Sequence, residues 1–144
     1  MKKANFEVHT SFISPWTWEN LVEKHNLLPI LAIRCISGSK IIGKFQNSSI
    51  HFKELAPSNE LYRLKRDGLI DIQEFHKRYI LELLENVNFS DIVEKFNKLY
   101  EISGASGIII FGYGSDDEKC HRSVLADILN KTDLFRNKIT EIIL

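Results

Sequence analysis

The sequence predicts an α/β domain in which helices flank a small, mostly parallel sheet. Strand-like and helix-like segments alternate along the chain, which is typical of this fold class. The apolar runs at 28–34 and 108–111 have the composition of strands covered on both faces, as in parallel sheets. With 144 residues, 44% of them hydrophobic, and no linker rich in Pro, Gly or Ser, residues 1–144 are expected to form one domain.

The first third of the chain predicts a strand, a helix and a second strand. Residues 5–12 alternate in a strand-like way. Ser14 and Pro15 are typical of an N-cap and a first helical position, so a short helix is expected over 16–26. This helix would return the chain for a parallel partner strand at 28–34.

Three helices are expected in the middle of the chain, after a long polar loop at 35–52. The expected N-terminal capping residues are Ser58, Asp71 and Ser90. Gly68 and Gly104 are expected to end the first and the third helix. The second helix, over 72–87, is the most regular, and its apolar stripe is predicted to consist of Phe75, Tyr79, Leu83 and Leu84.

The last part of the chain predicts a buried strand at 108–111, a polar loop, a helix and a final strand within 138–144. The helix is expected to carry Cys120, His121 and Arg122 in its first turn. Open α/β sheets bind ligands outside the carboxyl ends of their strands, and helix N-termini attract anions. This tripeptide is therefore the leading candidate for a functional site.

Two residues of the tripeptide are candidates for catalysis. A helix N-terminus stabilises a thiolate, so Cys120 is a possible nucleophile, and His121 is a possible general acid-base. Arg122 is a candidate anion ligand. Adjacent helical residues point about 100° apart, so at most two of the three are expected to reach one ligand. The alternative is that Cys120 is a small buried residue and that Arg122 pairs with the acidic residues 116–118.

Other candidate ligand-binding residues lie where predicted strands end. Ser11 is near the end of the first strand, and Arg34 and Cys35 are at the end of the second. Gly112 and Gly114 follow the buried strand, where they would let backbone amides approach a ligand closely. The glycines lack the GxGxxG spacing and the lysine of known phosphate loops.

Composition limits the partners that we expect. Lys plus Arg and Asp plus Glu each total 19, so net charge gives no support to nucleic-acid binding, which would need a local basic patch. The apolar runs fall short of the ~20 residues that span a bilayer, and the N-terminus lacks the apolar segment of a secretory signal. We expect a soluble, cytoplasmic protein with thiols at Cys35 and Cys120 and no membrane partner.

No metal ion or cofactor is predicted. The histidines and cysteines are scattered over separate elements without the spacing of zinc ligands. A cysteine phosphatase needs five residues between its cysteine and its arginine, which Cys120 and Arg122 do not provide.

Two motifs carry a resemblance to a known family. The segment FKELAPSNELYRLKRDGLIDIQEFHKRYILELLE, followed by an apolar strand and CHRSVLADIL, resembles domain-of-unknown-function family 488, whose members show an ELAPS-x-EL signature and a terminal CHR motif. The resemblance covers most of the chain and implies a Rossmann-like, three-layer α/β domain. It marks as site residues Glu54, Leu55, Ala56, Pro57 and Ser58 in the first motif and Cys120, His121 and Arg122 in the second.

The chain departs from the family pattern at one place. Many relatives have a cysteine and then an acidic residue just after the penultimate strand, where this chain has Gly112 and Gly114. The departure weakens a catalytic interpretation and leaves a binding interpretation intact. The two motifs are expected to converge on one anion-sized pocket at the edge of the sheet.

Three functions are compatible with these observations. The first is binding of a small anionic, nucleotide-like ligand at the strand carboxyl ends, next to the Cys-His-Arg helix. The second is an enzyme that acts on a nucleotide, nucleobase or nucleic acid through Cys120 or His121. The third is a partner-binding module with a vestigial site, which would use the helix at 72–87 or a surface formed by Trp16 and Trp18.

Overall fold

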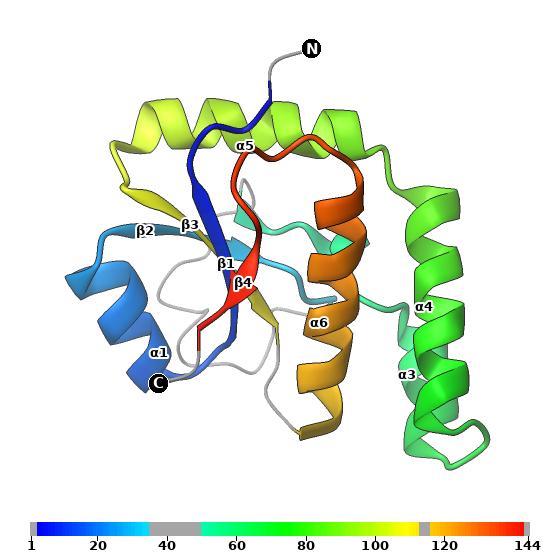
Figure 1. Cartoon of the computed structure of the whole chain (residues 1–144). Coiled ribbons are helices and arrows are strands. Elements are labelled where there is room, and N and C mark those ends of the chain that lie inside the picture. Colours follow the sequence, from blue (N-terminus) through cyan, green and yellow to red (C-terminus); the bar gives the residue numbers. More distant parts are fainter. Residues whose placement is uncertain (1–2, 35–49, 113–115, 143–144) are drawn as a thin grey trace.

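The fold is a four-stranded parallel sheet between two layers of helices, as the sequence predicts (Figure 1). The structure is a computed structural model that describes residues 3–34, 50–112 and 116–142, except for the side chains of 116–121. The strand order is β2-β3-β1-β4. The strands are β1 (Glu7–Phe12), β2 (Leu27–Leu31), β3 (Gly107–Gly112) and β4 (Thr140–Glu141).

Strand β3 occupies the centre of the sheet, and all six of its residues are buried. It pairs with β1 on one side and with β2 on the other. The expectation that β2 would be the neighbour of β1 is therefore wrong, because β3 lies between them. The apolar sequence of β3 requires cover on both faces and both sides, whereas β2 contains Pro29, which lacks an N–H donor and suits an edge strand.

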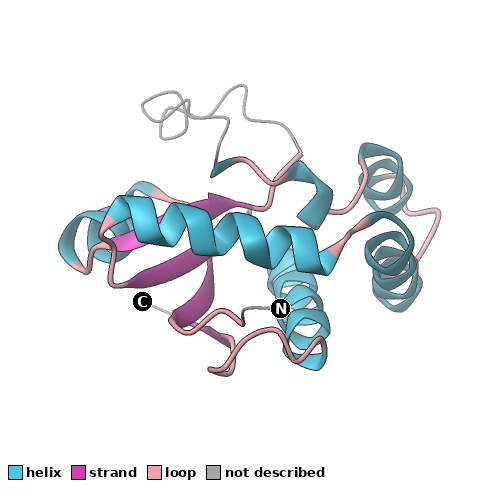
Figure 2. Cartoon of the chain, turned by 90° about the horizontal axis from the view of Figure 1, so that it is seen from above, coloured by secondary structure: helices cyan, strands magenta, loops and turns pink. Residues whose placement is uncertain are grey.

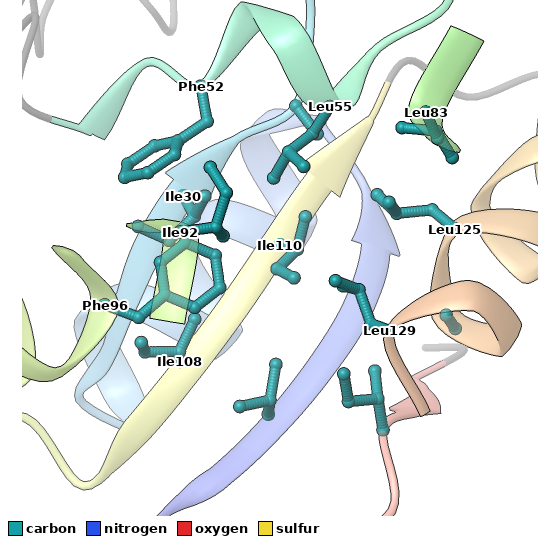
Figure 3. Packing of buried hydrophobic residues seen from close by; sticks show 14 of the residues in the cluster. Ile30, Phe52, Leu55, Leu83, Ile92, Phe96, Ile108, Ile110, Leu125 and Leu129 are labelled. Atoms are coloured by element: carbon teal, nitrogen blue, oxygen red, sulfur yellow. The ribbon is translucent and has the colours of Figure 1, made fainter. Parts of the chain in front are cut away.

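The two faces of the sheet have separate hydrophobic clusters, which follow from the alternation of side chains along β3. Ile108 and Ile110 point to one face, where they join residues of α4 (Ile72–Asn86), α5 (Phe89–Ser103) and α6 (Asp116–Lys131). Ile109 and Phe111 point to the other. Figure 3 shows the larger cluster, with its labelled residues gathered on one side of β3.

The smaller cluster is covered by the first helical segment. This segment begins as α1 (Pro15–Thr17) and continues as the π-helical η1 (Trp18–Lys24). Trp18 and Leu21 supply its buried side chains. In Figure 2, α5 crosses in front of the strands, and α3 (Asn59–Arg66) and α4 lie side by side at one end of the domain. The domain therefore has three layers.

Local capping sets the start of three helices as predicted. The side chains of Ser14, Ser58 and Asp71 each accept a hydrogen bond from the backbone N–H three residues on, and α1, α3 and α4 begin directly after them. Gly104, at φ 69°, ends α5 in the left-handed conformation that glycine favours.

Two predictions about the middle helices are wrong in detail. Helix α5 starts at Phe89 with Asn88 as its N-cap, because the Asn88 side chain accepts from the N–H of Asp91 and Ser90 is already inside the helix. Leu84 is 59% exposed and does not belong to the buried stripe of α4. It lies about 100° around the helix from Leu83, which places it beyond the surface that faces the core.

The start of α6 also differs from the prediction. The helix begins at Asp116, so Cys120, His121 and Arg122 lie in its second turn and not in its first. The free N–H groups of a helix belong to its first turn, and the effect of the dipole falls off within that turn. The stabilisation of a Cys120 thiolate by the helix N-terminus is therefore weaker than the sequence suggested.

Among the described residues, no helix is both long enough and apolar enough to cross a membrane.

Candidate functional site

The carboxyl ends of β1 and β3 form the topological switch point of the sheet. The two strands are neighbours and end together, with Phe12 opposite Gly112. One residue later, the N–H of Ile13 donates to the carbonyl of Gly112 at 2.8 Å. The chain leaves β1 for α1 and η1 on one face and leaves β3 for α6 on the other. Such divergence opens the crevice in which open α/β sheets bind ligands, and we call this place the carboxyl edge.

The first motif is held in place by two side chains from other elements. Leu55 ends the short 3-10 helix η3 (Lys53–Leu55), and its carbonyl accepts a hydrogen bond from the Tyr79 hydroxyl of α4. The next two carbonyls, of Ala56 and Pro57, accept from Arg34 Nη2 and Nε, both at 3.0 Å. Arg34, which we predicted to bind a ligand, thus also fixes the backbone of the motif.

Ser58 joins the first motif to α4. Its backbone N–H and its hydroxyl both donate to the carboxylate of Glu82, the former at 2.9 Å. Its oxygen also accepts from the N–H of Leu61 at 3.1 Å, which caps α3. The sequence showed the cap and missed Glu82, because a glutamate in a regular helix has no local signature of a partner 24 residues away.

The environment of Tyr79 favours the neutral phenol. The residue is fully buried, and this burial raises the pKa of its hydroxyl well above 10.0. The phenol of Tyr62 and the carboxylate of Glu82 act in the same direction, and the positive charge of Arg34 opposes them. A neutral phenol is the form that donates to the Leu55 carbonyl.

The second motif is tied to the sheet through Arg122. Its side chain is 6% exposed, and Nε lies 2.8 Å from Oε1 of Glu141 in β4. The guanidinium also lies over the ring of Phe12, 6.0 Å from its centroid. The proposed alternative, a pair between Arg122 and residues 116–118, concerns side chains outside those that the structure describes.

A buried hydroxyl lies beside this ion pair. Thr10 is opposite Glu141 in the pairing of β1 with β4 and is 1% exposed, and its Oγ1 has no hydrogen-bond partner among the residues that the structure describes. An unsatisfied hydroxyl costs about 1–3 kcal/mol. The region beneath the second motif is therefore polar although it lies within the core of the domain.

The other predicted site residues fall into two groups. Ser11 is buried, and its hydroxyl donates to the carbonyl of Ile142 at 3.0 Å, while Gly112 is the buried last residue of β3 and Glu54 is half-buried in η3. Cys35 and Gly114 lie outside the described residues, and so do the side chains of Cys120 and His121.

Leu55 of the first motif and the helix that carries the second motif pack in the same cluster around β3. Figure 3 shows Leu55 of the first motif and Leu125 of α6 on either side of Ile110, with Leu83 of α4 beyond them. Leu125 is three residues after Arg122. Packing on one strand end thus brings together segments that are far apart in the sequence.

The two tryptophans do not share the exposed surface that the sequence suggested. Trp16 is 57% exposed, whereas Trp18 is 3% exposed and stacks on Phe111 at 5.7 Å, so the two do not form one exposed surface. In the part of the chain that the structure describes, no group of three His, Cys, Asp or Glu residues could hold a metal ion.

Replacing Tyr79 with Phe should destabilise the protein by about 1–3 kcal/mol at neutral pH, because the buried Leu55 carbonyl loses its donor. Since the folded state raises the pKa of Tyr79, wild-type stability should also fall as the pH rises above ~10, where the unfolded phenol ionises first. Tyr79→Phe should lack this part of the alkaline loss. Urea unfolding at neutral pH and at a pH above ~10 measures the free energy of unfolding, with Tyr100→Phe as the control. If wild type and Tyr79→Phe lose equal stability at alkaline pH, the assignment is refuted.

The Arg122–Glu141 pair should show strong coupling. Glu141→Leu alone leaves a buried guanidinium without its carboxylate, which should cost about 3–5 kcal/mol. The double variant with Arg122→Met should lose less than the sum of the single variants. The exposed Glu74–Arg78 pair of α4, at 2.9 Å, is the matched control and should couple by about 0.3–0.5 kcal/mol. A coupling no larger than the control's would show that burial does not strengthen the pair.

Comparison with known families supports the family resemblance of the chain. Residues 23–133 match the family model DUF488-N3a, described as the active DUF488-N3 subclade. Curated proteins and solved structures give no match. The matched residues make up well over half of the chain and include the positions of both motifs. The chain therefore belongs to domain-of-unknown-function family 488, in its DUF488-N3 subclade.

Proposed function

We propose that this protein binds a small anionic, nucleotide-like ligand at the carboxyl edge, beside the helix that carries Cys120, His121 and Arg122. The observation that carries the proposal is the switch point, where adjacent strands β1 and β3 send the chain to opposite faces of the sheet. Ligands of open α/β sheets occupy this position because the chain leaves the two strand ends toward opposite faces of the sheet and backbone groups at the strand ends face outward.

Arg34 supports an anionic ligand. It lies two residues after Ala32, whose N–H donates to the carbonyl of Phe111 near the end of β3. Its hydrogen bonds go to neutral carbonyls, and no carboxylate of the described residues forms an ion pair with it. The carboxylate of Glu82 is bound to Ser58. Among the described residues, Arg34 thus has no ion-pair partner, and it brings a positive charge close to the carboxyl edge.

Arg122 has a different role in this proposal. Its charge is balanced by Glu141, and its side chain is almost fully buried. It therefore acts as a positioning residue that fixes α6 against β1 and β4. The ligand would be bound by the backbone at the start of α6 and by Arg34.

Isothermal titration with AMP, ATP, a cyclic dinucleotide and inorganic phosphate tests the proposal. At least one nucleotide should bind with a Kd below about 1 mM. Arg34→Gln should weaken that binding by about tenfold or more, because it removes the charge, and Arg34→Lys should weaken it less. The control is Lys98→Gln on α5, a helix that crosses the strands away from the carboxyl edge in Figure 1, and this variant should bind as wild type does. If no nucleotide binds below that limit, the proposal is wrong.

An enzyme is the second candidate, and the description of the subclade as active favours it. In this case Cys120 would be the nucleophile or His121 the general acid-base for a reaction on a nucleotide, nucleobase or nucleic acid. Two features argue against catalysis. Cys120 lies in the second turn of α6, where the helix N-terminus stabilises a thiolate less, and Gly112 stands in the region where many relatives have a cysteine and an acidic residue.

Alkylation by iodoacetamide tests the nucleophile. A Cys35→Ser variant leaves Cys120 as the single thiol, since the chain has two cysteines. The rate of alkylation against pH should show a midpoint below the ~8.5 of a free thiol if Cys120 is activated. A midpoint at or above that value would exclude Cys120 as an activated nucleophile, and a Cys35→Ser/Cys120→Ser variant supplies the background rate.

A further inference from the structure

We infer that Trp16 is the stacking platform for the base of the ligand, an inference that rests on the proposed nucleotide site at the carboxyl edge. Trp16 would thereby determine specificity for a phosphate ester that carries a planar aromatic ring. The sequence alone gave this residue only a place in a partner-binding surface with Trp18.

The exposure of Trp16 is unusual within this protein. Its side chain is 57% exposed, although tryptophan has a large apolar surface. The other large hydrophobic residues that the structure shows as exposed are aliphatic, and they are Leu69, Leu81, Leu84 and Ile102. Trp16 is thus the one aromatic member of this group among the described residues.

The backbone on either side of Trp16 is held firmly. Thr17 Oγ1 donates to the carbonyl of Phe12 at 2.7 Å, and Ser14 and Thr17 form a reciprocal capping box. Asn20 Nδ2 donates to the carbonyl of Trp16 itself at 2.8 Å. Pro15 fixes one more backbone angle. The indole is therefore carried by an ordered turn, so a ligand that stacks on it would order little of the backbone.

This turn stands at the carboxyl edge. Phe12 is the last residue of β1 and lies opposite Gly112, and the next residue, Ile13, is bonded to Gly112. Trp16 is the second residue of α1, which begins three residues after Phe12. Figure 1 shows α1 and α6 both starting at the edge where β1 and β3 end. Trp16 is therefore carried by a turn at the carboxyl edge, on the face of the sheet opposite to α6.

The surroundings of Trp16 favour a planar ligand over a protein partner. Protein interfaces place their aromatic anchors among other apolar residues that exclude water. The exposed aliphatic residues lie elsewhere, between α3 and α4, on α4 and on α5. A nucleobase needs one aromatic face only, and stacking is tolerant of which base is present because every base has a π face.

Binding of AMP and of ribose 5-phosphate, compared by isothermal titration, tests the inference. The two compounds share a phosphate and a ribose, and AMP adds the base. Wild-type protein should bind AMP at least about tenfold more tightly than ribose 5-phosphate. Trp16→Ala should abolish most of this difference while the affinity for ribose 5-phosphate stays unchanged, and Trp16→Phe should keep most of it.

Fluorescence provides a second measurement, because the chain has two tryptophans and Trp18 is buried. AMP should quench the emission of wild type and leave that of Trp16→Ala nearly unchanged. If Trp16→Ala binds AMP as wild type does, or if wild type binds both compounds equally, Trp16 is not the platform and the anion site stands. If wild type binds no nucleotide, the proposed function fails and the inference fails with it.

Discussion

The parallel pairing of β1 with β3 is the constraint on which the rest of the structure depends. It places six buried residues of β3 at the centre of the sheet and makes two strand ends coincide at Phe12 and Gly112. Because β3 needs cover on both faces, the helices divide between the faces, and the chain must diverge where the two strands end. The divergence of the chain at the carboxyl edge is thus a consequence of burying β3. The side chains that the neighbouring elements place at that edge then determine its chemistry.

The first motif shows how such side chains are brought into place. Three successive carbonyls, from Leu55 to Pro57, accept hydrogen bonds from Tyr79 and Arg34. A turn without regular secondary structure would otherwise bury these carbonyls without donors, at a cost of about 1–3 kcal/mol each. The same bonds connect the end of β2, the motif and α4. A substitution at Arg34 therefore changes both the shape of the edge and its charge, which is why the Lys variant is needed beside the Gln variant.

The second motif contributes a buried ion pair rather than a free cation. Removing a guanidinium and a carboxylate from water costs several kcal/mol per ion, and their attraction repays it only with good geometry. The 2.8 Å contact between Arg122 and Glu141 has that geometry, and the unpaired hydroxyl of Thr10 adds a further cost beside it. An apolar pair of similar size would stabilise the same contact of α6 with the sheet at least as well. The ion pair therefore fixes the position of α6 relative to β4 through a directional contact.

The sequence by itself determined the features that depend on a few neighbouring residues. The caps at Ser14, Ser58 and Asp71 and the buried character of β3 follow from local hydrogen bonds and from hydrophobic pattern. Tertiary structure decided the strand order and the partners of Arg34 and Arg122. It also decided that Trp16 is exposed and Trp18 is buried. These features depend on contacts between residues that are far apart in the sequence, such as Ser58 and Glu82, which are 24 residues apart. A local sequence pattern carries no information about such contacts. The sequence predicted a later start for α6 than Asp116, because the acidic residues of its first turn are equally compatible with a loop and with a helix.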